Sequence, residues 1–312
     1  MNSIRKDYIL DRWVVVAEAR GKRPHEFESS TVLKPGTDFF APGNEHLTPP
    51  EIGRLESKKG VWKLRWFPNK FSAVSDEKFA LKKGKKYLQE IPAYGVHEII
   101  AETRSSEKQL WDLPEKDIAD LFKVYRERIK ALLSKKNIKY VQVFKNHGKD
   151  GGTSLIHSHS QVVGIPKIPQ AIEEKLAGMR KNKVNYSQIV KLESKSERKA
   201  IETRHFAAIC PWASRFNYEI WVLPKKHYNS LEEMPDKVIS DLAKTMKKIL
   251  SKLKEIKAPY NYYLNYAPKG KKMLFHIEIT PRLATWAGFE FSTGFVINSV
   301  APEDAARFYK SK

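Results

Sequence analysis

The sequence has little of what marks secreted, membrane or zinc-finger proteins. Its 312 residues include one cysteine, Cys210, which excludes a disulfide framework and a thiolate-rich zinc site. No stretch approaches the roughly 18 consecutive apolar residues of a membrane-spanning helix, and the N-terminus lacks the apolar segment of a signal peptide. We therefore expect a cytoplasmic protein that has no membrane partner.

Acidic residues are also few relative to basic ones, and the formal net charge is +21. Such a charge attracts nucleotides, nucleic acids and other polyanions. Lysine and arginine are nevertheless spread along the whole chain, and no RRM, KH or zinc-finger signature is present. We expect a solvated basic surface and no dedicated nucleic-acid site. A nucleotide- or RNA-binding module without activity is the alternative, and it would show salt-sensitive RNA binding.

The most informative stretch is 154–163, which is apolar at both ends and has the length of a strand. Side chains alternate along a strand, so the pattern predicts His157, His159 and Gln161 on one face. Imidazole can act as a nucleophile, base or metal ligand near neutral pH, and an amide can donate to an anionic oxygen. The structural alternative is a pair of buried histidines bonded to backbone carbonyls. The glycine-rich loop 145–154 favours chemistry, since its backbone N–H groups could hold a phosphate, although it lacks the Walker spacing.

A tight basic cluster, Arg20 to Pro24, follows the N-terminal strand residues. Arginine binds phosphate through two parallel hydrogen bonds, so Arg20 and Arg23 are candidate phosphate ligands. The alternative is an exposed basic turn.

The second half of the sequence repeats the first. Glu98 and Glu219 are 121 positions apart, as are Pro114 and Pro235, and in both halves a strand precedes and an amphipathic helix follows. In the second copy His276 and Glu278 stand where His159 and Gln161 stand in the first, but Leu274 replaces His157. We therefore expect an α+β protein of two duplicated domains, 1–168 and 169–312, with the nucleophile in the first and binding surface in the second. His276 with Glu278 could bind a metal, but no third ligand is evident, so a structural role is favoured.

These residues, in order and spacing, resemble the galactose-1-phosphate uridylyltransferase family of the histidine-triad (HIT) superfamily over essentially the whole chain. The matching segments are Arg20–Pro24, Pro42–Glu45, Asn69 with Phe71, Asn146, Gly152–Ser154, His157–Gln161, His276–Glu278, Ala287–Glu290, Asn298 and Pro302–Ala306. The resemblance implies two HIT-like domains, each a mainly antiparallel sheet with packed helices, in a homodimer.

The resemblance also implies a double-displacement reaction. His159 would attack the α-phosphorus of UDP-glucose, releasing glucose 1-phosphate and leaving a uridylyl-histidine, and galactose 1-phosphate or another hexose 1-phosphate would then accept the UMP. Gln161 would bond a phosphate oxygen, and His157 would brace His159. Hydrolases of the superfamily carry a third histidine where Gln161 stands. A neutral amide offers no proton for hydrolysis, so the covalent intermediate can persist until the sugar phosphate binds.

The same resemblance assigns substrate-binding roles to further residues. These are Arg20 and Arg23 for phosphate across the dimer interface, Asn69, Phe71 and Asn146 for the nucleotide, Gly152 and Ser154 beside the phosphate, and Phe289 and Glu290 for the hexose.

Two departures from the family concern metals. Many members bind zinc through a C-x-x-C pair, a further histidine and the first histidine of the triplet, but here Asp38, Ala41 and a position near Ser106 stand at the other three places. At the second metal site of some members, Leu274 and Asn265 stand in place of two histidine ligands. We therefore expect no cofactor and no structural zinc.

Substrate identity has alternatives. The segment His157–Gln161 is also similar to the triplet of ADP-glucose and diadenosine-polyphosphate phosphorylases, which transfer AMP to inorganic phosphate through the same histidine intermediate. Hydrolysis is a third possibility. Glu290, within Ala-Gly-Phe-Glu, favours a sugar acceptor and hence the uridylyl reaction.

Overall fold

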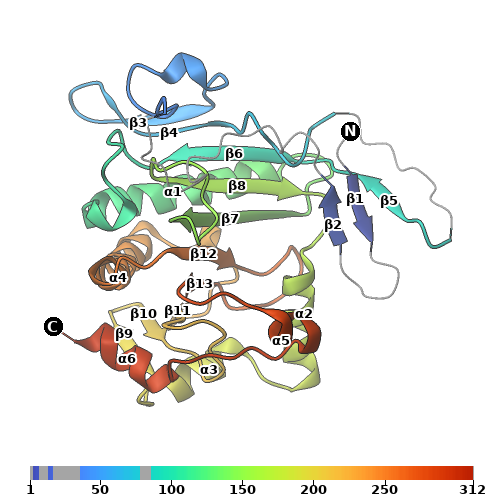
Figure 1. Cartoon of the computed structure of the whole chain (residues 1–312), viewed down its shortest axis with the longest axis vertical. Helices are drawn as coiled ribbons and strands as arrows, with labels where there is room; N and C mark the ends of the chain where they lie inside the picture. The colour runs from blue at the N-terminus through green and yellow to red at the C-terminus, as the bar shows by residue number, and fades with distance from the viewer. Residues whose placement is uncertain (1–2, 7–12, 17–35, 78–85, 312) are drawn as a thin grey trace. The chain divides into compact units, whose positions relative to one another are not determined.

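A computed structural model describes residues 3–6, 13–16, 36–77 and 86–311 (Figure 1). Arg20 and Arg23 lie outside the described residues. The chain divides into two compact units. The first unit comprises Met1–Glu107, Glu127–Val143 and Ser154–Ala177, and the second comprises Lys108–Arg126, Phe144–Thr153 and Gly178–Lys312. The predicted domain boundary after residue 168 stays a prediction.

The first unit is built on strands in the order β3-β4-β6-β8-β7, and the pairs from β3 to β8 are antiparallel. Their bounds are β3 Gly53–Glu56, β4 Trp62–Pro68, β6 Val96–Ala101, β8 His159–Ile165 and β7 Tyr140–His147. A separate small sheet has the order β2-β1-β5, with β1 Ser3–Lys6, β2 Trp13–Val16 and β5 Glu90–Pro92. A 3-10 turn, η2, spans Glu45–Leu47.

The second unit has antiparallel strands in the order β12-β13-β11-β10-β9, and Phe144–His147 of β7 pairs with β12. The strands are β9 Lys199–Glu202, β10 Phe206–Ile209, β11 Ile220–Pro224, β12 Tyr260–Asn265 and β13 His276–Pro281. Besides η2, the helices of the described residues are η3 Leu110–Asp112, α1 Glu115–Leu133, α2 Gln170–Lys181, α3 Tyr186–Glu193, η4 Leu231–Glu233, α4 Asp236–Glu255, α5 Gly288–Thr293 and α6 Pro302–Lys310. Within the described residues, none of the helices combines the length and apolar character needed to cross a membrane.

The predicted α+β class and the duplication are confirmed. The order β6-η3-α1-β7-β8 recurs as β11-η4-α4-β12-β13, and the helices begin 121 residues apart, at Glu115 and Asp236. The sequence alignment of the first strands is wrong by one residue. Ile99 pairs with Gln161 and Trp221 pairs with Glu278, so Ile99 corresponds to Trp221 because the second copy has one residue fewer between strand and helix.

The predicted strand over 154–163 is wrong in its first half, because β8 begins at His159. β6 ends at Ala101, which is the partner of His159, and one more backbone bond joins Glu102 N–H to the Ser158 carbonyl. Beyond that bond residues 154–157 have no neighbouring strand to pair with on this side. His157 therefore does not share a strand face with His159 and Gln161.

The two faces of β8 have different environments. A Cβ on Gly164 would lie 3.3 Å from Ile138 and 3.6 Å from Leu132 at the C-terminal end of α1, so that end of α1 covers the face of Gly164. Side chains alternate, so His159 and Gln161 project from the opposite face.

A buried ion pair joins α1 to β6 within the first unit. The Arg128 guanidinium donates from Nε and Nη2 to the two carboxylate oxygens of Glu98, each at 2.8 Å, and the two side chains are 10% and 1% exposed. Two parallel bonds to a charged group in a dry site make the geometry specific. Removal of one partner would leave a buried charge uncompensated.

We predict that Arg128→Ala lowers the free energy of unfolding by about 3–5 kcal/mol, measured by urea denaturation. A matched control is Arg126→Ala on the same helix, because its partner Asp236 is 62% exposed. The control should lose no more than about 1 kcal/mol. Equal losses for the two variants would contradict the importance of burial.

Candidate active site

A cavity of about 320 Å³ lies in the first unit, over the face of β8 that carries His159 and Gln161. Its floor includes Phe67, Ile99 and Gln161, which are register partners across β4, β6 and β8. The full lining is Phe39, Phe40, Leu47, Thr48, Pro49, Phe67, Asn69, Lys70, Phe71, Ile99, Ser154, Leu155, His159 and Gln161. A mostly apolar cavity with a few polar groups is typical of a small-molecule site.

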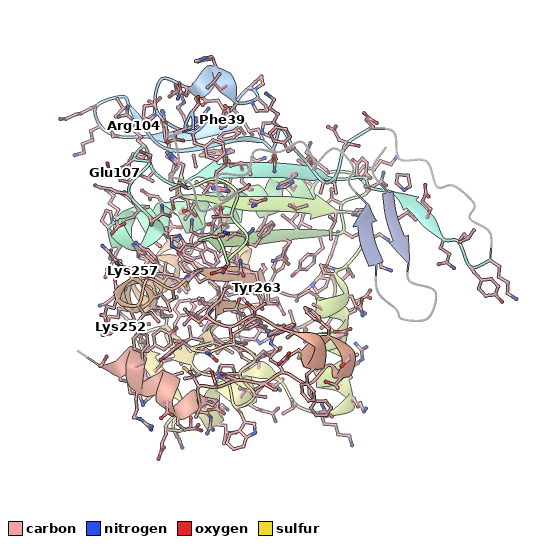
Figure 2. The ribbon with its side chains drawn as sticks, in the orientation of Figure 1. Phe39, Arg104, Glu107, Lys252, Lys257 and Tyr263 are labelled. Carbon is pink, nitrogen blue, oxygen red and sulfur yellow. The ribbon has the colours of Figure 1, made fainter. Side chains whose placement is uncertain are left out.

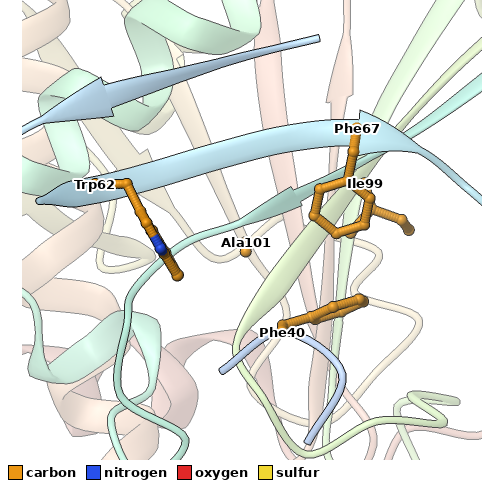
Figure 3. Packing of buried hydrophobic residues seen from close by; sticks show 5 residues of the cluster. All are labelled: Phe40, Trp62, Phe67, Ile99 and Ala101. Carbon is orange, nitrogen blue, oxygen red and sulfur yellow. The ribbon is translucent and has the colours of Figure 1, made fainter. Parts of the chain in front are cut away.

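An apolar cluster contributes Phe40, Phe67 and Ile99 to the lining of the cavity. Figure 3 shows its members, Phe40, Trp62, Phe67, Ile99 and Ala101, with the rings of Phe40 and Phe67 pointing toward each other at a centroid distance of 5.3 Å. Phe39, labelled in Figure 2, packs against the cluster together with Leu155. These apolar side chains keep the local dielectric constant low, which strengthens hydrogen bonds in the cavity.

His159 is held by its own neighbour. Its Nδ1 lies 2.8 Å from the backbone carbonyl of His157, and the ring of Phe40 stands edge-on at 5.5 Å. A carbonyl only accepts, so Nδ1 carries the hydrogen and the neutral ring keeps its lone pair on Nε2. The geometry therefore fixes which nitrogen of His159 can act as a nucleophile or base.

His157 lies behind His159 and is not part of the cavity lining. Its Nδ1 lies 2.8 Å from Oδ2 of Asp38, and its Nε2 lies 2.7 Å from the backbone carbonyl of Thr103. Each ring nitrogen faces an oxygen acceptor, so both bonds form together when both nitrogens carry hydrogen. His157 thus joins the segments of Asp38 and Thr103 and presents its own carbonyl to His159.

Gln161 lines the cavity and also contacts a residue to which the sequence analysis gave no role. Its Oε1 lies 2.9 Å from Nε2 of His97, which is 4% exposed on β6. Asn69 lies beside the same ring, and its Oδ1 accepts a bond from the backbone N–H of Phe71 at 2.9 Å. The predicted nucleotide residues Asn69 and Phe71 therefore connect to Gln161 through His97.

Asn146 and Gly152 lie in the second unit, whereas Ser154 lines the cavity of the first. Asn146 Oδ1 accepts a 2.9 Å bond from Nδ2 of Asn261. Gly152 has φ of +78°, a conformation that glycine adopts without strain, and its N–H donates to the Lys149 carbonyl at 2.8 Å. The loop is thus a sequence of turns with internal hydrogen bonds.

Phe289 and Glu290 lie on α5 in the second unit. Phe289 is 51% exposed. The Glu290 carboxylate accepts a 2.9 Å bond from the backbone N–H of Ala287, and this bond lowers the pKa of Glu290. Its negative charge is therefore stabilised at the N-terminus of its own helix.

The copy of the triplet in the second unit has the same histidine-to-carbonyl bond, but Leu274 stands in place of His157 and Glu278 in place of Gln161. His276 Nδ1 lies 2.9 Å from the Leu274 carbonyl, as His159 Nδ1 does from His157. Its Nε2 faces Glu278 at 3.4 Å, and Tyr186 stacks on the ring at 4.3 Å. Glu278 also accepts bonds of 2.8 Å from Arg215 and from Tyr263, labelled in Figure 2. Burial raises the pKa of Tyr263, so this hydroxyl remains a donor.

Asp38 and His157, which stand at two of the family's zinc-ligand positions, are engaged with other groups. Asp38 and His157 bond to each other, and the second nitrogen of His157 faces the Thr103 carbonyl, so both ring nitrogens have an oxygen acceptor beside them. Across the part of the chain that the structure describes, no three His, Cys, Asp or Glu side chains form a metal-binding group.

Comparison with known proteins places this geometry in context. Residues 1–169 match the family model described as galactose-1-phosphate uridyl transferase, N-terminal domain, and residues 106–308 match a domain of unknown function, DUF4921. ADP-glucose phosphorylase of Arabidopsis thaliana is 32% identical over 97% of this chain and 91% of that protein. Galactose-1-phosphate uridylyltransferase of Thermotoga maritima is 29% identical over 98% of this chain and 97% of that protein.

Solved structures agree with these matches. The Arabidopsis ADP-glucose phosphorylase with bound ADP-glucose superposes with a TM-score of 0.78 at 30% identity, covering 100% of this chain and 99% of that chain. A uridylyltransferase structure gives 0.82 at 26% identity, covering 99% of this chain and 97% of that chain. Because the match to the N-terminal-domain model covers more than half of this chain, the chain belongs to the galactose-1-phosphate uridylyltransferase family of nucleotidyltransferases.

Proposed function

We propose that the protein transfers UMP from UDP-glucose to galactose 1-phosphate, or another hexose 1-phosphate, through a covalent intermediate on His159. The observation that carries the proposal is the bond from His159 Nδ1 to the His157 carbonyl, which leaves the lone pair on Nε2 of a ring that lines the cavity together with Gln161. A neutral, oriented imidazole in an apolar site is a competent nucleophile toward phosphorus.

The two steps balance on the same atom. His159 Nε2 forms a bond to the α-phosphorus, the bond from that phosphorus to the bridging oxygen breaks, and glucose 1-phosphate leaves with the electron pair. A phosphate oxygen of the acceptor then attacks the same phosphorus, and the N–P bond breaks to return the pair to Nε2. Gln161 donates from its amide to a non-bridging oxygen in both steps and supplies no proton.

The remaining predicted residues complete the substrate site in this proposal. Asn69 and Phe71 contact the nucleotide at the cavity, with Ser154 beside the phosphate. Asn146 contributes to the nucleotide site, and the Gly152 backbone contributes to the phosphate site. Phe289 and Glu290, on the exposed helix α5, contact the hexose. Arg20 and Arg23 reach phosphate across the interface of a homodimer.

A second candidate function is adenylyl transfer from ADP-glucose to inorganic phosphate. It is favoured by the 32% identity to the Arabidopsis ADP-glucose phosphorylase along nearly the whole chain. The chemistry at His159 and Gln161 is the same in both candidates. They differ in the base and in the acceptor, so the covalent intermediate separates them directly.

We predict that brief incubation with UDP-glucose, without acceptor, increases the intact mass by one UMP. ADP-glucose is tested in parallel, and a gain of AMP in place of UMP would select the second candidate. No adduct with either donor would overturn both.

The matched variants are His159→Asn and His276→Asn, because asparagine can keep the donor at the Nδ1 position and lacks the nucleophile. His159→Asn should form no adduct, and His276→Asn should behave like the wild type. Adduct formation by His159→Asn would contradict the assigned nucleophile.

We predict that Gln161→His raises the ratio of hydrolysis to transfer by about tenfold, because imidazole can exchange a proton with water or the leaving group. The ratio is measured from free nucleoside monophosphate and nucleotide-sugar product in one reaction. An unchanged ratio would count against the role of the neutral amide.

We also propose that the chemistry and the fold need no zinc, since Asp38 and His157 form a hydrogen bond with each other. Dialysis against a chelator is expected to leave the melting temperature and the exchange rate unchanged. Asp38→Ala removes the partner of His157 and should lower the melting temperature with or without chelator. A melting temperature that falls on chelation of the wild type would contradict the proposal.

A further inference from the structure

The amide of Gln161 has two ends of similar shape and opposite hydrogen-bonding character. Its NH₂ group can donate to an anionic phosphate oxygen, whereas its carbonyl oxygen would repel that oxygen. The reaction proposed above therefore depends on which end faces the cavity. A rotation of the terminal torsion exchanges the two ends, so a neighbouring group must select one.

His97 is the neighbour placed to select it. It lies on β6, two residues from Ile99, the register partner of Gln161, and is 4% exposed. Its Nε2 lies 2.9 Å from Gln161 Oε1. An amide oxygen only accepts, so this contact is a hydrogen bond when Nε2 carries the hydrogen. The oxygen is then held at β6, and the NH₂ group is the end presented to the cavity.

Asn69 lies close to the same ring but does not compete for Nε2. Its Nδ2 is 3.1 Å from Nε2 and 3.4 Å from Nδ1 of His97. Nearly equal distances to both nitrogens place the NH₂ group over the ring face, out of line with either in-plane bond. Asn69 is held there by its Oδ1, which accepts from Phe71 N–H, and by its own N–H, which donates to the His97 carbonyl at 2.8 Å.

We propose that His97 is a positioning residue that holds the Gln161 carbonyl oxygen and thereby aims the Gln161 NH₂ group at the reacting phosphate. The inference rests on the proposed function and adds a residue to it. His97 is not part of the cavity lining and acts through Gln161. A histidine that only fills the core would affect stability and leave the reaction rate per folded molecule unchanged.

Two isosteric variants separate these roles. The amide nitrogen of glutamine can reach the position of Nε2, whereas that of asparagine reaches only the position of Nδ1. His97→Asn should slow adduct formation at saturating donor by about 10- to 100-fold, as expected for loss of an oriented donor to a developing anion. His97→Gln should stay within about threefold of the wild type, and donor affinity should change less than twofold in both, since only the orientation of one amide changes. Equal rates for His97→Asn and wild type would overturn the proposal.

A double-mutant cycle gives a readout that stability cannot imitate. In a Gln161→Ala background there is no amide to orient, so adding His97→Asn should leave the remaining rate unchanged. Independent losses that multiply would overturn the proposal. Thermal unfolding of each variant gives the folded fraction. If His97→Asn does not fold, His97→Leu, which also lacks a donor at the Nε2 position, takes its place in both backgrounds with the same expected and contradicting results.

The wild type is measured first, with UDP-glucose and with ADP-glucose. An adduct with either donor, together with unaffected His97 variants, would remove the role of His97 and leave the proposed function standing. No adduct in the wild type would remove the proposed function and the role of His97 with it.

Discussion

The geometry of the site depends on one hydrogen bond, from His159 Nδ1 to the backbone carbonyl of His157. This bond sets the tautomer and the direction of the ring, and so sets where the Nε2 lone pair lies. The carbonyl is fixed in turn because His157 is anchored by Asp38 on one side and Thr103 on the other. A bond between residues two apart would be mobile in a free loop, and the anchoring of His157 makes it rigid.

The second unit shows what the bond does without its surroundings. His276 makes the same bond to Leu274, yet its Nε2 faces the buried carboxylate of Glu278, and Tyr186 covers the ring. There the ring faces a charged carboxylate, whereas His159 lines the cavity together with the neutral amide of Gln161. The bond from Nδ1 to the carbonyl two residues earlier is therefore common to both copies. In the first copy it is combined with the cavity, the amide of Gln161 and the anchored His157.

Period-two alternation placed His159 and Gln161 on one face, and both line the cavity. The same rule failed for His157, because the end of β6 decides where β8 begins and no local pattern records that. Asp38 and His157 are 119 positions apart, so no local pattern records their contact, and only the resemblance, which aligns both with ligand positions of one zinc site, brought them together. His97 looked like an ordinary strand residue for the same reason: its role comes from a partner on a neighbouring strand. The repeated helices were predictable, because amphipathic spacing is a local property, whereas a one-residue difference in a connection was not.

The chain is similar both to a uridylyltransferase and to an ADP-glucose phosphorylase, and the construction of the site is compatible with either reaction. In the proposed reaction the two groups that act on phosphorus, His159 and Gln161, are strand residues held by backbone register and by buried bonds. In the proposed reaction the nucleotide base takes no part in that chemistry. It can therefore be recognised by other lining residues, such as Asn69 and Phe71, which lie on a loop after β4. A family can therefore change its base or acceptor through loop residues while the strand residues stay the same, and overall similarity alone does not decide between the two reactions.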